Sequence, residues 1–186
     1  MIIEKALKEA EDKMKKTIEA TRREFVTIRT GRASSALLDS VKVEYYGTPT
    51  PLKQLATIST PDVRLIVIHP WDKSYLGAIE KAILEADLGL VPTNDGKVIR
   101  ISIPHLTEER REELTKVVRR IAEDGRVALR SVRRDAVEHL RQKEKEGAIT
   151  VDQRFKSQDR AQELTDKYIG EIDHIVAEKE KEIKEV

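Results

Sequence analysis

Arginine is the residue type with the clearest chemical pattern in this chain of 186 residues. The chain has 17 arginines, and nine of them lie between Arg110 and Arg141. On a helical wheel of residues 114–141, one sector of about 140° collects seven bases and a single acid. The acid is Glu123, and the bases are Lys116, Arg119, Arg126, Arg130, Arg133, Arg134 and Arg141. Because guanidinium groups match phosphate oxygens, this sector predicts a surface for a polyanion.

Two other interpretations of this arginine-rich sector stay open, namely a solvated helix face and a surface for an acidic protein. A solvated face usually mixes both signs of charge and uses Lys and Glu, as residues 178–182 do. Aromatic residues make up only 4% of the chain, so base stacking is not expected to dominate. We therefore expect recognition of shape and phosphate, as in structured RNA or a duplex.

Residues for catalysis or for holding a metal ion form no complete motif. Four histidines lie far apart without ligand spacing, at His69, His105, His139 and His174, and there is no cysteine. Residues 89–97 approach a phosphate-binding loop, but six residues separate the glycines where four are needed, and Val98 replaces the required hydroxyl. We expect no enzyme activity, no bound metal and no cofactor.

The N-terminal segment and the overall composition argue against export and against a membrane span. The segment is charged from Glu4 onward and lacks the apolar stretch of a secretory signal. No apolar run approaches the roughly 18 residues that a spanning helix needs. The absence of cysteine fits a reducing compartment. These features predict a cytoplasmic protein.

Charges and helix-breaking residues divide the chain into a middle segment and two flanks. Charged residues make up about 22% of residues 31–104 and about 47% of the remainder, and all six prolines lie between Pro49 and Pro104. The flanks are therefore expected to be helical, and the middle to form a small α/β unit. In that unit we expect strands near residues 41–45, 65–68 and 98–103, a turn at residues 47–51 and a helix through residues 76–86.

The flanks predict three long helices, each with one apolar stripe. The first carries Leu7, Ala10, Met14, Ile18, Thr21, Phe25 and Ile28, and ends at Thr30-Gly31. The second starts near Thr107 and ends at Gly147, with Gly125 on its stripe, which indicates a close helix approach. The third opens with the capping box Thr150–Gln153 and carries Phe155, Ala161, Leu164, Tyr168, Ile172, Ile175 and Ile183. A three-helix bundle would bury these stripes, and an extended homodimeric coiled coil remains the alternative.

Several long segments resemble the bacterial ribosome recycling factors, in family order over essentially the whole chain. The matching segments are residues 28–34, 36–39, 43–52, 54–56, 80–83, 87–90, 106–111 and 132–136. Departures from the common pattern are Ser35 and His105 in place of Pro, and Val91 in place of Asn. None of these three positions lies on the arginine-rich sector.

The resemblance implies an α+β, two-domain, L-shaped protein. Residues 1–30 and 105–186 would form an elongated antiparallel three-helix bundle. Residues 31–104 would form the inserted small α/β domain, a mixed sheet plus a helix. The hinge residues would lie near 30–31 and 104–106: Thr30, Gly31, Arg32, Pro104, His105 and Leu106.

The resemblance also implies a function. Such factors bind the large ribosomal subunit after termination and, with elongation factor G and GTP, split the post-termination complex and release ribosomes from messenger RNA. Motif by motif, the residues that contact ribosomal RNA carry over to Arg111, Arg130, Arg133 and Arg134. We expect a monomer with no membrane partner. A general structured-RNA-binding helical module is the alternative.

Overall fold

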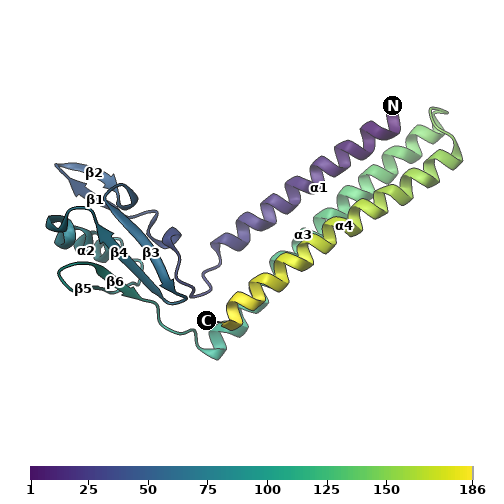
Figure 1. The fold of residues 1–186 in the computed structure, drawn as a ribbon. Helices are drawn as coiled ribbons and strands as arrows, with labels where there is room; N and C mark the ends of the chain where they lie inside the picture. The colour runs from purple at the N-terminus through teal and green to yellow at the C-terminus, as the bar shows by residue number, and fades with distance from the viewer. Residues whose placement is uncertain (186) are drawn as a thin grey trace. The chain divides into compact units, whose positions relative to one another are not determined.

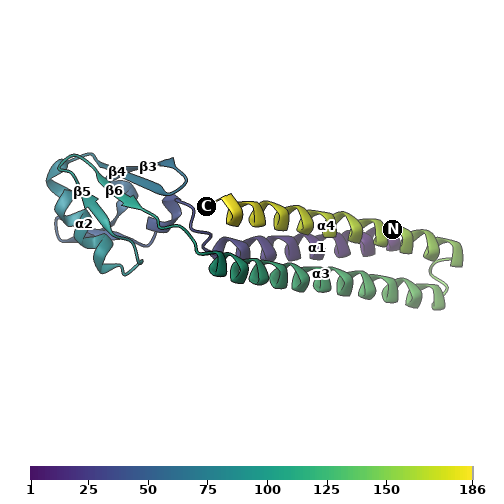
Figure 2. The same cartoon turned by 90° about the horizontal axis from the view of Figure 1, so that it is seen from below.

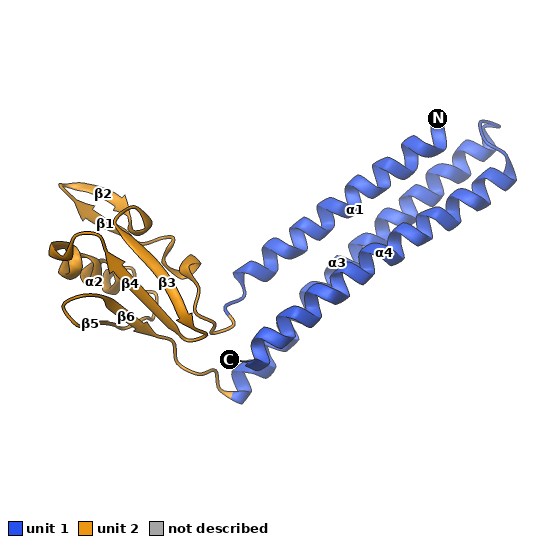
Figure 3. Cartoon of the chain, viewed as in Figure 1, with its two compact units in different colours: residues 1–29, 108–185 blue, residues 30–107, 186 orange. Residues whose placement is uncertain are grey.

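The computed structural model describes residues 1–185, and these residues form two compact units (Figure 3). The helical unit comprises Met1–Arg29 and Glu108–Glu185. The mixed unit comprises Thr30–Thr107 and contains all the strands (Figure 1). The chain therefore leaves the helical unit after its first helix and returns to it for the other two.

Three long helices make up the helical unit: α1 (Ile2–Thr27), α3 (Glu108–Lys145) and α4 (Val151–Glu185). They lie side by side as a bundle in which α3 runs opposite to α1 and α4 (Figures 1 and 2). The bundle confirms the predicted helical architecture. Its apolar stripes are buried within a single chain, as the expected α1 residues from Leu7 to Phe25 show.

Local sequence explains where α4 begins and which face it buries. The Thr150 hydroxyl accepts a hydrogen bond from the Gln153 amide at 3.2 Å, and the Gln153 side chain accepts one from the Thr150 amide at 2.9 Å. This reciprocal pair is the predicted capping box. The expectation that Phe155 belongs to the buried stripe is wrong, because its side chain is 55% exposed. The buried row passes through Ser157 and Ala161 instead, and the Arg154 guanidinium lies 4.1 Å from the Phe155 ring.

Gly125 of α3 lies in close contact with α1 and α4. A Cβ atom added there would lie 2.8 Å from the Thr21 hydroxyl oxygen of α1 and 2.9 Å from the Ile172 Cδ1 atom of α4. A larger residue would therefore force these neighbouring side chains to move. The predicted close helix approach at this glycine is confirmed.

The mixed unit contains a hairpin, a four-stranded sheet and one α-helix. The hairpin pairs β1 (Lys42–Tyr45) with β2 (Thr48–Pro51). The sheet has the order β3-β4-β6-β5, formed by β3 (Ala56–Asp62), β4 (Leu65–Pro70), β5 (Pro92–Asn94) and β6 (Ile99–Ser102). The α-helix is α2 (Leu76–Glu85), and the short 3-10 helices span Ser35–Leu38, Leu52–Gln54 and Lys73–Tyr75.

Two expectations about the mixed unit need correction. The sheet is antiparallel throughout instead of mixed. Residues 48–51 form β2 instead of a turn, and the turn itself is only Tyr46-Gly47. A strand accepts Pro49 and Pro51 here because β2 has one paired neighbour, and proline is tolerated at an edge where no ladder donor is needed.

The core of the mixed unit lies between its strands and α2. Ile66, Ile68, Ile99 and Ile101 of the sheet and Ile79 of α2 are fully buried. These residues alternate along each strand, so one face of the sheet meets the apolar face of α2. Within residues 1–185, no helix combines the length and the hydropathy that crossing a bilayer requires.

Candidate nucleic-acid interface

Ion pairs join the arginine-rich face of α3 to acidic residues of α4. Arg119 donates to Glu180 at 2.8 Å, and Arg126 donates to Asp173 at 2.6 Å. Because the two helices run antiparallel, seven residues forward along α3 correspond to seven residues back along α4. The same step from Arg126 leads to Arg133, which should face Asp166.

The third step of this register does not form an ion pair. The Arg133 guanidinium instead donates to the side-chain oxygen of Gln162 at 2.6 Å, and the Gln162 amide group donates to Asp166 at 2.8 Å. A neutral amide therefore stands between the arginine and the carboxylate. Arg133 uses one of its five N–H donors in this bond, which leaves most of them for another acceptor.

Glu123 neutralises a second part of the arginine-rich face. Its carboxylate accepts from Arg130 at 3.0 Å and from Arg126 at 3.2 Å. Hydrogen bonds from Arg130 and then Arg126 lower the pKa of the Glu123 carboxyl, which stays ionised. The sequence pattern indicated a face of nearly one sign, but Arg119, Arg126 and Arg130 all pair with carboxylates of the same chain.

A groove between α3 and α4, which we call the arginine groove, is lined by Arg133, Arg134 and Arg141. Its volume is about 430 Å³, and its lining comprises Arg133, Arg134, Val137, Glu138, Arg141, Gln158, Asp159 and Gln162. Arg141 has a long ion pair with Glu138 at 3.6 Å. Within residues 1–185, Arg134 forms no ion pair and Arg133 bonds only to an amide. The arrangement offers forked N–H donors to an anion such as phosphate.

Arg111 is not part of this groove. It lies in the first turn of α3, is half-buried and already has an interaction partner. Arg133 follows 22 residues later, which is about 33 Å along a straight helix. Of the seven arginines that the sequence singled out, Arg133, Arg134 and Arg141 line the arginine groove, while Arg126 and Arg130 meet at Glu123.

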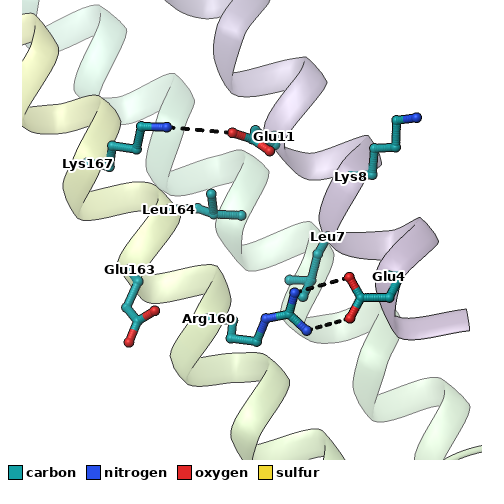
Figure 4. A pocket seen from close by; sticks show the side chains of 8 residues that line it. All are labelled: Glu4, Leu7, Lys8, Glu11, Arg160, Glu163, Leu164 and Lys167. Carbon is teal, nitrogen blue, oxygen red and sulfur yellow. Dashed lines mark hydrogen bonds and ion pairs between the residues drawn. The ribbon is translucent and has the colours of Figure 1, made fainter. Parts of the chain in front are cut away.

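A groove between α1 and α4 shows how the same residue types behave when they are paired (Figure 4). In this ion-paired groove of about 370 Å³, Arg160 forms two hydrogen bonds with the Glu4 carboxylate, at 2.6 and 3.1 Å. Lys167 lies 3.8 Å from Glu11. The Arg160 hydrogen bond lowers the pKa of the Glu4 carboxyl, and the Tyr168 hydroxyl does the same for Glu11. These pairs satisfy Arg160 and Lys167, so that Lys8 is the cation of this groove that forms no ion pair within residues 1–185.

Both connections between the units contain the residues that were expected to form hinges. In the first, Thr30 is buried, Gly31 has a φ of 75° and Arg32 is exposed; in the second, Pro104 and His105 are exposed and Leu106 is half-buried. Residues 103–107 have no regular secondary structure.

Hydrogen bonds hold both connections beside one turn of the mixed unit. The Ala33 amide donates to the Val63 carbonyl at 2.7 Å, and the Ile103 amide donates to the Arg64 carbonyl at 2.8 Å. Val63 and Arg64 are neighbours between β3 and β4, so the two connections enter the mixed unit side by side.

Sequence reasoning missed the acidic row on α4, although a signal for it was present. Asp159, Asp166, Asp173 and Glu180 follow one another at intervals of seven residues, as Arg119, Arg126 and Arg133 do on α3. Residues seven apart lie on the same face of a helix. Aligning the two rows in antiparallel order would have predicted the ion pairs. Among the described residues, no group of His, Asp or Glu side chains is arranged to hold a metal ion.

Comparison with known proteins gives a consistent result over the whole chain. The family model described as "Ribosome recycling factor" matches residues 21–183. The ribosome-recycling factor of Heliobacterium modesticaldum is 57% identical over 185 residues and covers 100% of both chains. That of Carboxydothermus hydrogenoformans is 56% identical over 182 residues, covering 98% of each chain.

Solved structures agree with the sequence matches. A solution structure of the ribosome recycling factor has a TM-score of 0.74 and 48% identity, covering 100% of this chain and 99% of the other. A second match comes from models for the T. thermophilus ribosome recycling factor and the E. coli elongation factor G bound to the E. coli post-termination complex. It has a TM-score of 0.65 and 43% identity over 98% of this chain and 99% of the other. The chain therefore belongs to the ribosome recycling factor family.

Proposed function

We propose that this chain recycles ribosomes after termination, acting together with elongation factor G and GTP. The similarity at more than half of all positions to ribosome-recycling factors of equal length supports this function. The related factor in a solved assembly is bound with elongation factor G to a post-termination complex. The chain would split that complex and release the ribosome from messenger RNA.

The arginine groove is the proposed contact with ribosomal RNA of the large subunit. One observation carries this assignment, namely that Arg133 bonds to the neutral Gln162 side chain, which stands between it and Asp166. Arg133 and Arg134 are thus cations without an acidic partner in the described chain, on a helix that holds them in fixed positions. Their forked donors fit phosphate oxygens, and Arg141 would add a third contact once phosphate displaces its long pair with Glu138.

The paired arginines have a different role in this proposal. Arg119, Arg126 and Arg130 hold α3 against α4 or against Glu123, and so keep the arginine groove in shape. An RNA contact through them would have to break an existing ion pair. The proposed binding set is therefore narrower than the full arginine-rich sector, and Arg111 lies outside it.

The two connections are the proposed hinges. Backbone hydrogen bonds at Ala33 and Ile103 mark their ends on the mixed unit, so bending would concentrate at residues 30–32 and 104–106. The helical unit would stay docked on RNA while elongation factor G moves the mixed unit. A cross-link that fixes the two units should then preserve docking and abolish splitting, and splitting that survives it would contradict the hinge.

The factor itself is proposed to catalyse no reaction, since GTP hydrolysis belongs to its partner. We propose that it acts as a monomer in the cytoplasm, where bacterial ribosomes work.

The decisive experiment measures subunit release from post-termination ribosomes. Release should require this chain, elongation factor G and GTP together, and should fail when any one is omitted. Release that proceeds without elongation factor G, or that this chain does not stimulate, would contradict the proposal. A general structured-RNA-binding module is distinguished by comparing affinity for intact large subunits with affinity for a random RNA duplex, since that alternative predicts similar values.

A further inference from the structure

Four aromatic side chains gather on one surface of the mixed unit, far in sequence from the arginine groove. The chain has only seven Phe, Trp and Tyr residues, yet Tyr45, Tyr46, Trp71 and Tyr75 all line one groove of about 480 Å³. Tyr46 is 83% exposed and Trp71 is 69% exposed. We call these four residues the aromatic surface. Large aromatic groups left in water are typical of sites that bind another molecule.

The three tyrosines of the aromatic surface support one another. The ring centroids of Tyr45 and Tyr46 lie 4.6 Å apart in an edge-to-face arrangement, and those of Tyr45 and Tyr75 lie 5.0 Å apart. Trp71 is held separately, because its indole N–H donates to the Thr57 hydroxyl at 3.1 Å. The rings are therefore ordered before any ligand arrives, which lowers the entropy cost of binding.

The backbone conformation at Tyr46 is one that a tyrosine does not favour. Tyr46 and Gly47 form the two-residue turn between β1 and β2, with φ angles of 48° and 74°. Asn, Asp and Gly are favoured in both positions of such a turn, whereas a tyrosine there is strained. Strain in an exposed residue that carries a ring into a groove is a known mark of binding sites.

The charge of the groove selects among possible ligands. Its lining comprises Tyr45, Tyr46, Thr48, Thr50, Gln54, Leu55, Trp71, Asp72 and Tyr75, so Asp72 is its one charged side chain and it contains no Lys or Arg. Hydrogen bonds from the backbone and side chain of Ser74 lower the pKa of the Asp72 carboxyl, which stays negative. Phosphate is disfavoured beside an unneutralised carboxylate, and a cation is favoured.

We propose that the aromatic surface binds an extended, proline-containing segment of a protein partner, with a basic side chain of that segment beside Asp72. Proline-rich segments dock into aromatic-lined grooves because their backbone is already extended and their carbonyl groups accept hydrogen bonds from neighbouring hydroxyls. Burial and the Tyr46 hydroxyl raise the pKa of Tyr75 from 10 to about 12. Like any tyrosine at neutral pH, Tyr75 therefore keeps a phenol O–H that can donate.

The intact chain allows a direct test because Trp71 is its single tryptophan. The probes are the acetylated peptide Arg-Pro-Leu-Pro-Pro-Leu-Pro, the same peptide with Glu in place of Arg, and oligoadenylate. The Arg peptide should shift Trp71 emission to shorter wavelength in a saturable manner, and the Glu peptide should bind about tenfold more weakly.

Substitution of Tyr46 separates binding from folding. Tyr46→Asn should weaken the Arg peptide about tenfold while the Tm stays equal or rises, since Asn suits this backbone conformation. Tyr46→Phe keeps the ring and should bind nearly as the unaltered chain does.

Three results would overturn the proposal. The first is no saturable emission change at millimolar Arg peptide. The second is tighter binding of oligoadenylate than of the Arg peptide, which would indicate a base-stacking surface. The third is an emission shift that depends on the concentration of the chain alone, which would indicate a second copy as the occupant. None of these measurements uses ribosomes, so they fail or succeed independently of the recycling function.

Discussion

The two grooves that flank α4 contain the same kinds of residue but differ in how their charges are satisfied. In the ion-paired groove beside α1, Arg160 is held by the Glu4 carboxylate and Lys167 by Glu11. In the arginine groove beside α3, Arg133 is held by an amide and Arg134 forms no ion pair within residues 1–185. Their volumes, about 370 and 430 Å³, are similar. The abundance of basic residues therefore says less about binding than the identity of the neighbouring acceptor.

A surface ion pair contributes little to stability, typically less than about 1 kcal/mol. It nevertheless consumes donors that a phosphate would need, and an entering phosphate would meet an adjacent carboxylate. Placing the Gln162 amide between Arg133 and Asp166 thus costs the bundle little and leaves Arg133 available. This difference between the two grooves can be tested by removing a cation from each.

Arg133→Ala should cause the largest change in ribosome binding. Loss of charge-assisted hydrogen bonds worth about 2 kcal/mol would weaken binding to the large subunit roughly thirtyfold. The slope of log affinity against log salt should also fall by about one unit, because one phosphate contact is lost. Both are measured by titrating labelled protein with large subunits at several salt concentrations.

Arg160→Ala is the matched control in the ion-paired groove. It also removes an arginine side chain, here from α4. Because Arg160 is paired with the Glu4 carboxylate of the same chain, affinity for the large subunit and the salt slope should stay unchanged. Equal losses for the two variants would mean that the grooves do not differ in function. Circular dichroism should show intact helices in both.

Gln162→Glu should add the ion pair between α3 and α4 that is missing beside Arg133. The new carboxylate would pair with Arg133, as Asp173 pairs with Arg126, and would repel an approaching phosphate. We expect affinity for the large subunit to fall about tenfold with little change in the free energy of unfolding. Gln162→Ala adds no charge but removes the amide that separates Arg133 from Asp166, so it should also weaken binding, by a smaller factor. If both variants bind normally, the amide is not what keeps Arg133 available.

Local features of the sequence predicted the fold well, because the interactions involved span only a few residues. The capping box at Thr150 and Gln153 and the buried stripe of α1 follow from spacing alone. β2 was missed because Pro49 and Pro51 resemble a turn, and only its place at an edge makes them acceptable. Phe155 was misplaced because an apolar residue type was given more weight than its angle on the helix.

The candidate site was harder to predict because its charges are set by a partner helix. A wheel drawn for α3 alone cannot show that Asp173 and Glu180 of α4 reach Arg126 and Arg119. That information lies in the register between two helices. The family resemblance implied RNA contacts at Arg111, Arg130, Arg133 and Arg134, and the structure shows that Arg130 is paired with Glu123 whereas Arg133 and Arg134 are not paired with a carboxylate within residues 1–185.

Gly125→Ala tests whether close packing keeps this register. Alanine favours the helix by about 1 kcal/mol, but its Cβ would collide with Thr21, whose hydroxyl is held by a 2.9 Å hydrogen bond to the Thr17 carbonyl. Overpacking costs about 1–3 kcal/mol, so a net loss of about 1 kcal/mol is expected in urea unfolding. Gly170→Ala on α4 meets no atom within 4 Å and should stabilise the protein by about 1 kcal/mol. Stabilisation by both substitutions would show that the contact is not restrictive.

The smallest expected effect is on acid stability and concerns the ion-paired groove. The Tyr168 hydroxyl donates to Glu11 at 2.8 Å and lowers the pKa of the Glu11 carboxyl below its usual 4.5. The folded state therefore binds fewer protons than the unfolded chain in this range. The stabilisation is fully present above pH 4.5 and is lost as pH falls through the lowered pKa. Urea midpoints at pH 7 and pH 3 should differ less for Glu11→Gln than for the unaltered chain.

Glu19→Gln provides the control for this acid effect, since Glu19 is exposed on the same helix and forms no ion pair within residues 1–185. Its pH dependence should follow that of the unaltered chain. Ribosome binding at neutral pH should be unaffected by either substitution, because both lie away from the arginine groove. A loss of binding in Glu11→Gln would show that the ion-paired groove also contacts the ribosome, and the contrast between the two grooves would then be one of degree.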